Sequence, residues 1–287
     1  MGDIMGAAKR ALRVVTVFTL AGATLAAGET RKDLHFKVGK RPTVSINNPY
    51  GPVVVKAGGA REVVINAILH SGKVEIDQSQ GRNRIDIVSH LLTGADPKSG
   101  AVDYVVLVPP DANLSVHAEN GAIHAEKLQG DVTIEGNSGS IEVVDCAGGH
   151  VHVKTLNAPV SLSNVRSAHV EVVSMAGNVT LNSVSGPNVT VNSNTGKIEY
   201  AGDFGGEGEY DFTSHTGDIE AVAPANASID VTARSSEGRV DSDFSLEPKH
   251  TPFIAKAGSY FSGTLNKAAS SVRLMSFSGR IHLKKRQ

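Results

Sequence analysis

Four polar residues near the middle of the chain have the side chains of a zinc site: His150, His152, His169 and Glu171. Imidazole nitrogens and carboxylate oxygens are common zinc ligands. Val151 and Val170 lie nineteen residues apart, and if they occupy equivalent places in a repeat, the four side chains form one outward-facing cluster. Asp131 and Glu135 lie one repeat earlier. The cluster is a candidate metal site, and the other interpretation is a solvated polar stripe whose histidines respond weakly to pH.

Two pairs of acidic residues have the spacing of a glycoside-cleaving site, Glu126 with Glu142 and Glu220 with Asp241. Such enzymes hold two carboxylates roughly 5 to 9.5 Å apart, and neighbouring strands about 4.8 Å apart supply that distance. A carbohydrate-active β-helix enzyme, either a polysaccharide lyase or a hydrolase, is therefore one alternative. Because no catalytic motif surrounds either pair, we interpret them as polar outward positions. We predict that the chain is not an enzyme and has no catalytic residue.

Two further kinds of site are excluded by their residue types. The single cysteine, Cys146, has no partner in the chain for a disulfide, and we expect it to be buried as a small apolar residue. Calcium-binding β-rolls need an aspartate at a fixed place in a glycine-rich repeat. The nearest match, 205–210, has Tyr210 at that place. We predict no bound cofactor.

These candidates are positioned by a repeat in which a small residue, any residue and then Val or Ile recur between Gly121 and Val240. From Ile123 to Ile198 the apolar positions follow one another at intervals of nine or ten residues, so that two intervals make about nineteen. Each of these apolar positions begins a short run in which apolar and polar residues alternate. This period of two is the pattern of a strand with one buried face. Runs this short in a fixed register are typical of a solenoid. We predict an all-β, single-stranded parallel β-solenoid (β-helix-like), with about 19 residues and two main strands per coil and a divergent C-terminal cap.

The apolar positions divide into two columns that we expect to stack inside the solenoid. One column contains Val132, Val151, Val170, Val189, Tyr210 and Ile229. The other contains Ile123, Ile141, Val160, Val179, Ile198, Ile219 and Val240. Glycine precedes many of these residues, which we interpret as sharp reversals at positive φ, a region that glycine enters without steric cost.

One solenoid domain accounts for residues 29–287. Residues 29–110 have looser spacing and are expected to form its opening coils, 111–247 its regular coils, and 248–287 its C-terminal coils and cap. The cap is expected because an open end of a solenoid exposes unpaired strand edges.

Residues 1–28 have the pattern of a secretory signal peptide: basic residues, then an apolar run over 14–27 that is too short to span a bilayer, then small residues. Removing them takes the formal net charge from −1 to −3, because they hold three basic side chains and one acid. So small a charge gives no reason to expect nucleic-acid binding. We predict export to the periplasm or the cell surface, with no membrane span after cleavage.

Three segments resemble a known family. They are the opening 48–55 (Asn-Pro-Tyr-Gly-Pro-Val-Val-Val), the Gly-x-Ile/Val units, and the close from 263–266 to 276–283, which ends in Ser-Gly-Arg-Ile-His-Leu. Together they are similar to a bacterial family of secreted β-solenoid proteins of unknown function described as "putative adhesins". One departure is 267–269, Lys-Ala-Ala, where that family tends to have glycines. The resemblance implies an exported, non-catalytic protein of the cell envelope or surface, and it brings no catalytic residues.

The sequence repeat and the family resemblance together predict a structural or interaction module. Ladders of Thr, Asn, Ser and charged side chains on the outer strands are expected to make multivalent contact with a glycan or a protein. The partner and the oligomeric state stay open at this point.

Overall fold

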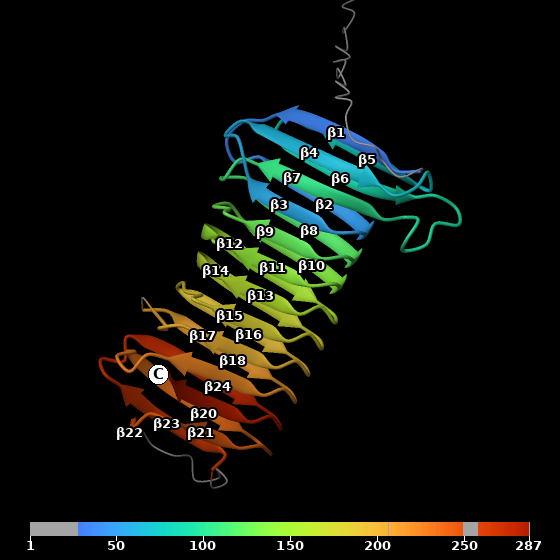
Figure 1. Ribbon diagram of the computed structural model, residues 1–287. Helices are drawn as coiled ribbons and strands as arrows, with labels where there is room; N and C mark the ends of the chain where they lie inside the picture. Colours follow the sequence, from blue (N-terminus) through green and yellow to red (C-terminus); the bar gives the residue numbers. More distant parts are fainter. Residues whose placement is uncertain (1–27, 206, 249–257, 287) are drawn as a thin grey trace, which may run out of the picture.

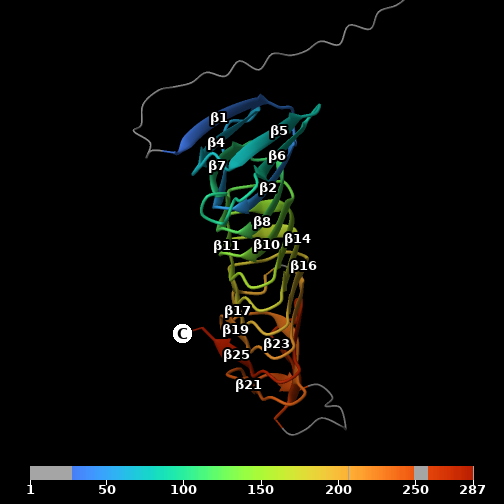
Figure 2. The same cartoon turned by 90° about the vertical axis from the view of Figure 1, so that its right-hand side faces the viewer.

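The computed structural model describes residues 28–205, 207–248 and 258–286, and every regular element in these ranges is a β-strand. The strands stack into an elongated rod (Figure 1), which is narrow when seen from the side (Figure 2). The expected signal peptide lies outside the described residues, apart from Gly28. The described part of the chain contains no helix with the length and apolar character to cross a membrane.

The described strands form two sheets. Sheet A has twelve strands, in the spatial order β1 (Thr30–Lys37), β4 (Glu62–Leu69), β7 (Val102–Val108), β3 (Val53–Ala57), β9 (Ile123–Glu126), β11 (Ile141–Val144), β13 (Val160–Ser163), β15 (Val179–Asn182), β17 (Ile198–Ala201), β19 (Ile219–Ala223), β25 (Ile281–Lys285) and β21 (Val240–Ser242). Sheet B has thirteen, in the order β22 (Glu247–Pro248), β23 (Tyr260–Leu265), β20 (Ile229–Ser235), β24 (Ser270–Ser276), β18 (Glu209–Ser214), β16 (Asn188–Ser193), β14 (Arg166–Ser174), β12 (Ala147–Thr155), β10 (Val132–Ser138), β8 (Asn113–Asn120), β2 (Thr43–Tyr50), β6 (Arg84–Leu91) and β5 (Val74–Gln80).

Each regular coil contributes one strand to sheet B and the next strand to sheet A, and neighbouring coils pair in parallel. Val151 lies between Val132 and Val170 in sheet B, and Val160 lies between Ile141 and Val179 in sheet A. The predicted all-β parallel solenoid with two main strands per coil is therefore confirmed.

The alternating sequence explains why both sheets have one buried face. In β10 Val132 and Ile134 are buried while Thr133 between them is partly exposed, and β-branched residues of this kind suit a pleated, half-buried surface. The inward side chains of both sheets join into one continuous hydrophobic core. The outward side chains of the regular coils are then available for contact with solvent or a partner.

A row of buried hydroxyls closes the corner where sheet B turns into sheet A. Ser174 Oγ donates to the carbonyl of Gly177 at 2.7 Å, and Ser193 Oγ donates to that of Gly196 at 2.9 Å. One coil further, Ser214 Oγ accepts the Gly217 N–H at 2.9 Å. Each serine sits at the end of its strand and bonds three residues ahead, so that the turn is held from inside and the buried hydroxyl has a partner.

The glycines at this corner serve a different purpose from the one expected. A Cβ at Gly196 would lie 2.1 Å from the carbonyl oxygen of Gly177 in the neighbouring coil, and one at Gly217 would lie 2.1 Å from that of Gly196. Positive φ does occur at Gly139, at 100°. At Gly196 and Gly217, however, the positive-φ interpretation is wrong: glycine is needed because stacked backbones approach too closely for a side chain.

Left-handed residues lie at the opposite corner, where sheet A turns back into sheet B. Lys127, Asp145, Asn164 and Ser183 each follow a sheet A strand directly and have φ between 55 and 60°. Asx residues tolerate this conformation better than most non-glycine residues. Asn164 also donates its side-chain amide to Asp145 Oδ1 at 3.1 Å, which links two successive turns.

Both ends of the rod depart from the stacking expected. The two strands nearest the C-terminus, β24 and β25, do not close the end but lie inside the stack: β24 pairs with β18 and β20, and β25 with β19 and β21. In the sheet B column, Tyr210 was expected to be followed by Ile229. Val272 follows it instead, and Val231 follows Val272. The end is capped by β20 to β23, with β23 antiparallel to β20.

The opening segment also contains a coil that does not stack in sequence order. The coil of β2 and β3 lies between the coil of β8 and β9 and that of β6 and β7. Strands β4 and β5, expected to be part of the opening coils, instead fold back antiparallel on β7 and β6, and β1 covers β4. Antiparallel strands at both ends cover parallel edges that would otherwise offer unpaired backbone groups.

The close approach of turns predicts that Gly196→Ala destabilises the protein by about 1–3 kcal/mol, the usual cost of overpacking a rigid interior. Gly59→Ala is the matched control, because a Cβ there meets no atom within 4 Å and φ is not positive. Urea denaturation of both variants measures the difference. Equal free energies of unfolding for the two would contradict the role assigned to the corner glycines.

Candidate functional site

The outer face of sheet B carries the four residues predicted as a metal cluster. His150 pairs in register with His169, and His152 with Glu171, as the nineteen-residue spacing predicts. The two rings of His150 and His169 have centroids 6.2 Å apart, and His152 Nδ1 lies 3.0 Å from Glu171 Oε2. The register is therefore confirmed, and the four side chains lie on one face of two adjacent strands.

The side chains nevertheless interact in separate pairs. His150 Nδ1 lies 3.0 Å from Asp131 Oδ1, and the same oxygen accepts the His150 backbone N–H at 2.9 Å. This backbone hydrogen bond is the main reason that the pKa of Asp131 is lowered. Glu135 lies beside Lys154 in register and 3.4 Å from His117, away from the cluster. Across the described part of the chain, no three His, Cys, Asp or Glu side chains come together as a metal site. Metal binding here stays a prediction.

The outer face of sheet A brings together the first predicted pair of carboxylates through a histidine. His124 Nδ1 lies 2.9 Å from Glu142 Oε2, and its Nε2 lies 3.2 Å from Glu126 Oε2. Two cations also hold Glu126: Lys127 Nζ at 2.7 Å and Lys56 Nζ at 3.1 Å. The group is a network of ion pairs in which the imidazole ring occupies the space between the two acids.

These partners decide the protonation of Glu126. Hydrogen bonds from Lys127 first, then from His124 and Lys56, lower its pKa to about 2. A general acid must carry its proton at the working pH, which enzymes achieve by raising the pKa of a carboxyl group. Glu126 is ionised at neutral pH and therefore lacks the proton that a glycoside-cleaving acid would donate.

The second predicted pair is not formed by neighbouring strands. Glu220 and Asp241 both pair in register with His282, which lies between them on β25. The inserted strand puts two strand spacings, about 9.6 Å, between their backbones, so the expectation of adjacent coils is wrong. Each acid is held by its own cations: Lys284 Nζ lies 2.9 Å from Glu220, and Arg280 and Arg239 lie 2.9 Å from Asp241.

The pKa values of both acids are lowered. For Glu220 the hydrogen bond from Lys284 is the largest cause. For Asp241 desolvation is the largest single effect and raises the pKa, but the combined hydrogen bonds and charges of Arg280 and Arg239 outweigh it. Neither acid is therefore a proton donor at neutral pH.

One pattern of polar contacts was predicted from the sequence only in part, through His152 and Glu171. Eight of the ten histidines in the described ranges lie 2.9–3.9 Å from a carboxylate oxygen: His35, His70, His90, His117, His124, His150, His152 and His282. Several of these pairs join neighbouring strands, as His152 and Glu171 do. The only signal in the sequence is a histidine and an acid separated by the coil length. Most histidines of the described surface therefore lie in a short-range pair with an acid.

Ladders of small polar side chains continue between these pairs. Ser161 pairs with Thr180 on sheet A, and Ser115 pairs with Thr133 on sheet B. All four are partly exposed. The lone cysteine, Cys146, does not belong to this surface: it is buried, and burial raises the pKa of its thiol.

Comparison with known proteins gives one family match. A family model described as Toastrack DUF4097 matches residues 43–284. Among the curated proteins searched, none matches this chain.

Three solved structures match this chain at low sequence identity. A "putative cell adhesion protein" from Clostridium sporogenes is 12% identical, with a TM-score of 0.34, over 90% of this chain and 100% of that one. A "putative adhesin" from Bacteroides fragilis is 10% identical, with a TM-score of 0.48, over 91% and 98% of the two chains. A "putative adhesin" from Parabacteroides merdae is 10% identical, with a TM-score of 0.39, over 91% and 97%.

The lowered pKa of Glu126 predicts how stability depends on pH. A carboxyl group whose pKa is lowered in the folded state adds to the free energy of unfolding. For Glu126 this stabilisation is fully present above the ordinary pKa of 4.5 and is lost as the pH falls toward about 2. Between these limits, Glu126→Gln is expected to weaken the fall in the free energy of unfolding. The measurement is chemical denaturation as a function of pH, with Glu119→Gln at an exposed position as control. Identical pH profiles for Glu126→Gln and the wild type would refute the assignment.

Proposed function

The chain belongs to the Toastrack DUF4097 family, and from this premise we propose that it is an exported, non-catalytic interaction module of the bacterial surface. It binds through the polar ladders on the outside of the solenoid, as an adhesin does. The partner that suits these ladders best is a glycan, whose hydroxyl groups match the hydroxyl and amide groups of the strands. A protein partner is the other outcome of the experiment below.

The observation that carries the proposal is the regular repetition of the outer positions. In sheet B one outward column runs through Ser115, Thr133, His152, Glu171 and Thr190 in successive coils. Strands in a sheet lie about 4.8 Å apart, so polar side chains recur at a fixed interval along the rod. A partner that also repeats along its length can make many weak contacts at once, and linked weak contacts give avidity without any single strong site.

The rigid scaffold contributes to such binding. Each side chain of this column belongs to a strand that pairs with a neighbour on both edges. A surface that is already ordered loses little conformational entropy when it binds. The proposed mechanism is therefore recognition by a preorganised face, with no chemical step.

The lowered pKa values of Glu126, Glu220 and Asp241 support the non-catalytic proposal over a carbohydrate-active enzyme. All three acids are neutralised by cations or histidine in the folded chain. A glycoside hydrolase needs one acid that keeps its proton near neutral pH.

Export predicts that residues 1–28 are removed and that the mature chain begins at Glu29. Expression of the full-length gene in a bacterial host, followed by intact-mass measurement of the envelope fraction, tests this. Leu20→Arg, which interrupts the apolar run, is expected to leave the full-length chain in the cytoplasm. If the wild type also keeps residues 1–28, the export proposal fails.

The binding proposal predicts that the mature chain, 29–287, binds members of an array of bacterial and host glycans without altering them. Two matched variants locate the face: Ser161→Arg/Thr180→Glu on sheet A and Ser115→Arg/Thr133→Glu on sheet B. Each places opposite charges on neighbouring strands, a favourable pair, and leaves the core untouched. We expect one of them to weaken binding about tenfold or more, as loss of repeated contacts predicts. Product analysis after long incubation completes the test.

Three results would count against the proposal. New reducing ends or unsaturated products would make the protein an enzyme. Binding that neither variant changes would move the contact surface away from the ladders. If the mature chain binds bacterial or host surface proteins and no glycan, the partner is a protein and not a glycan.

A further inference from the structure

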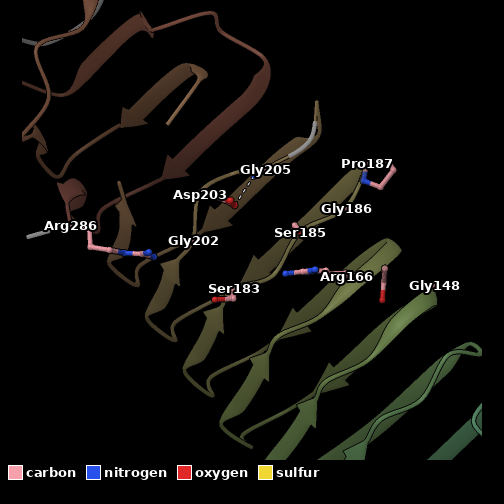
Figure 3. Close-up of a pocket in the computed structure, with 11 residues that line it drawn as sticks. Gly148, Arg166, Ser183, Ser185, Gly186, Pro187, Gly202, Asp203, Gly205 and Arg286 are labelled. Carbon is pink, nitrogen blue, oxygen red and sulfur yellow. Dashed lines mark hydrogen bonds between the residues drawn. The ribbon is translucent and has the colours of Figure 1, made fainter. Parts of the chain in front are cut away.

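A polar groove interrupts the corner where sheet A turns back into sheet B. It has a volume of about 630 Å³ and extends across the turns of four successive coils, from Gly148 to Gly205. Figure 3 shows its lining side chains between the strand ends. The volume lies within the range of roughly 300–1,000 Å³ that is usual for small-molecule sites.

The groove exists because the turns lengthen along the rod. The link from β11 to β12 contains two residues, 145–146, and so does the link from β13 to β14, 164–165. The link from β15 to β16 contains five, 183–187, and the next contains seven, 202–208. The longer links start their sheet B strands later, which leaves a hollow beside β12 and β14.

Buried aromatic residues pack beneath the longest of these four links, 202–208. Tyr200 and Phe204 stack with ring centroids 4.3 Å apart. The Tyr200 hydroxyl accepts the Phe204 backbone N–H at 3.1 Å, and the Tyr210 hydroxyl donates to the Gly205 carbonyl at 3.0 Å. These hydrogen bonds hold the described part of the turn against the core, so that the groove is a built feature of this coil.

Two arginines face each other across the hollow. Figure 3 shows Arg166, from the start of β14, and Arg286, which follows β25, extending toward one another with Ser183 between them. The Arg286 backbone is fixed by a hydrogen bond from its N–H to Ala223 O at 2.7 Å. Within the described residues neither guanidinium group has an ion-pair partner. These two cations line one hollow and are available to an anion.

Hydroxyl and carboxylate groups complete the lining. Ser167 is 4% exposed, and its hydroxyl is the one buried side-chain oxygen or nitrogen in the described chain without a hydrogen-bond partner. Ser185 pairs with Arg166 through an isolated β-bridge, which puts it beside the arginine. Asp203 accepts the Gly205 N–H at 3.0 Å and has further oxygen lone pairs. A buried hydroxyl without a partner is uncommon, and it offers a ligand one more hydrogen bond.

We propose that this groove binds an acidic saccharide, a sugar unit that carries a carboxylate, phosphate or sulfate group. The planar guanidinium groups of Arg166 and Arg286 bind such an anion in a bidentate manner. The neighbouring sugar hydroxyls donate to the Asp203 carboxylate, which only accepts, and they exchange hydrogen bonds with the serine hydroxyls, which both donate and accept. The inference deepens the proposed glycan-binding function and rests on it.

The chemistry of the lining separates this ligand from other classes. Pro187 is the only lining residue with a larger apolar side chain, so the groove gives an apolar molecule little to contact. One acid against two arginines leaves a small positive charge, which suits a single anionic group better than a polyanionic backbone with several adjacent phosphates.

The experiment is isothermal titration of the mature chain, 29–287, with a uronic-acid tetrasaccharide and with its methyl ester, which has the same sugars without the charge. A phosphorylated and a sulfated oligosaccharide identify the acid group preferred. Arg166→Gln, Arg286→Gln and Ser167→Ala test the lining. Arg82→Gln, an exposed arginine near the other end of the rod, is the matched control.

We expect one of the acidic saccharides to bind, and its methyl ester or neutral parent to bind at least about tenfold more weakly. Each arginine variant is expected to lose about tenfold in affinity, as removal of a charge-assisted hydrogen bond predicts. Arg82→Gln is expected to stay within about twofold. Circular dichroism and melting temperature show that the variants are folded.

The groove proposal is overturned if no acidic saccharide binds, if acid and neutral forms bind equally, or if both arginine variants bind as the wild type does. The glycan array distinguishes this failure from that of the proposed function. Glycan binding that the ladder variants weaken and the arginine variants do not would refute the groove and leave the surface module standing. No glycan binding in either experiment would refute both.

Discussion

The fold depends on close stacking of one backbone corner on the next. At this corner the buried serines bond to the turn from inside, and glycine allows the carbonyl of one coil to approach the α-carbon of the next, as at Gly196 over Gly177. The parallel register follows, because each turn fixes where the next strand begins. Once the corners hold the register, the interior needs only apolar side chains of suitable size, and Val, Ile and Leu fill most of the buried positions.

Because stability resides in the corners and the interior, the outer faces are free to vary. They hold histidine–carboxylate pairs, lysine–glutamate pairs and short hydroxyl ladders. Most of these are partly exposed pairs of the kind that contributes about 0–1 kcal/mol each. Their value to the protein is therefore chemical: they supply a regular, nearly neutral array of donors and acceptors on a rigid support. The groove departs from that array, because two arginines without an ion-pair partner line the same hollow.

Local pattern was sufficient to predict the regular coils. The period of two marked the strands, and the spacing of nineteen placed His150 beside His169 and His152 beside Glu171. It was insufficient at the ends, because the run around Val272 has the same alternation as every other strand and can pair with any of them. Side-chain partners were equally hidden, since Asp131 reaches His150 only once the register is known. The groove could not be predicted, because it depends on turn length and on the hydrogen bonds by which buried tyrosines hold the longest of its turns.

The position of β25 between β19 and β21 has a consequence for how the molecule is made. A chain synthesised or exported from its N-terminus can stack coils as they emerge, up to β19. The coil of β20 and β21 then has no neighbour in the stack until the last seventeen described residues, 270–286, enter the space between it and the preceding coil. Completion of the rod therefore waits for residues 270–286. A chain that stops early loses the inserted coil and leaves the cap detached, so that truncation exposes a bare parallel edge of the kind that promotes aggregation.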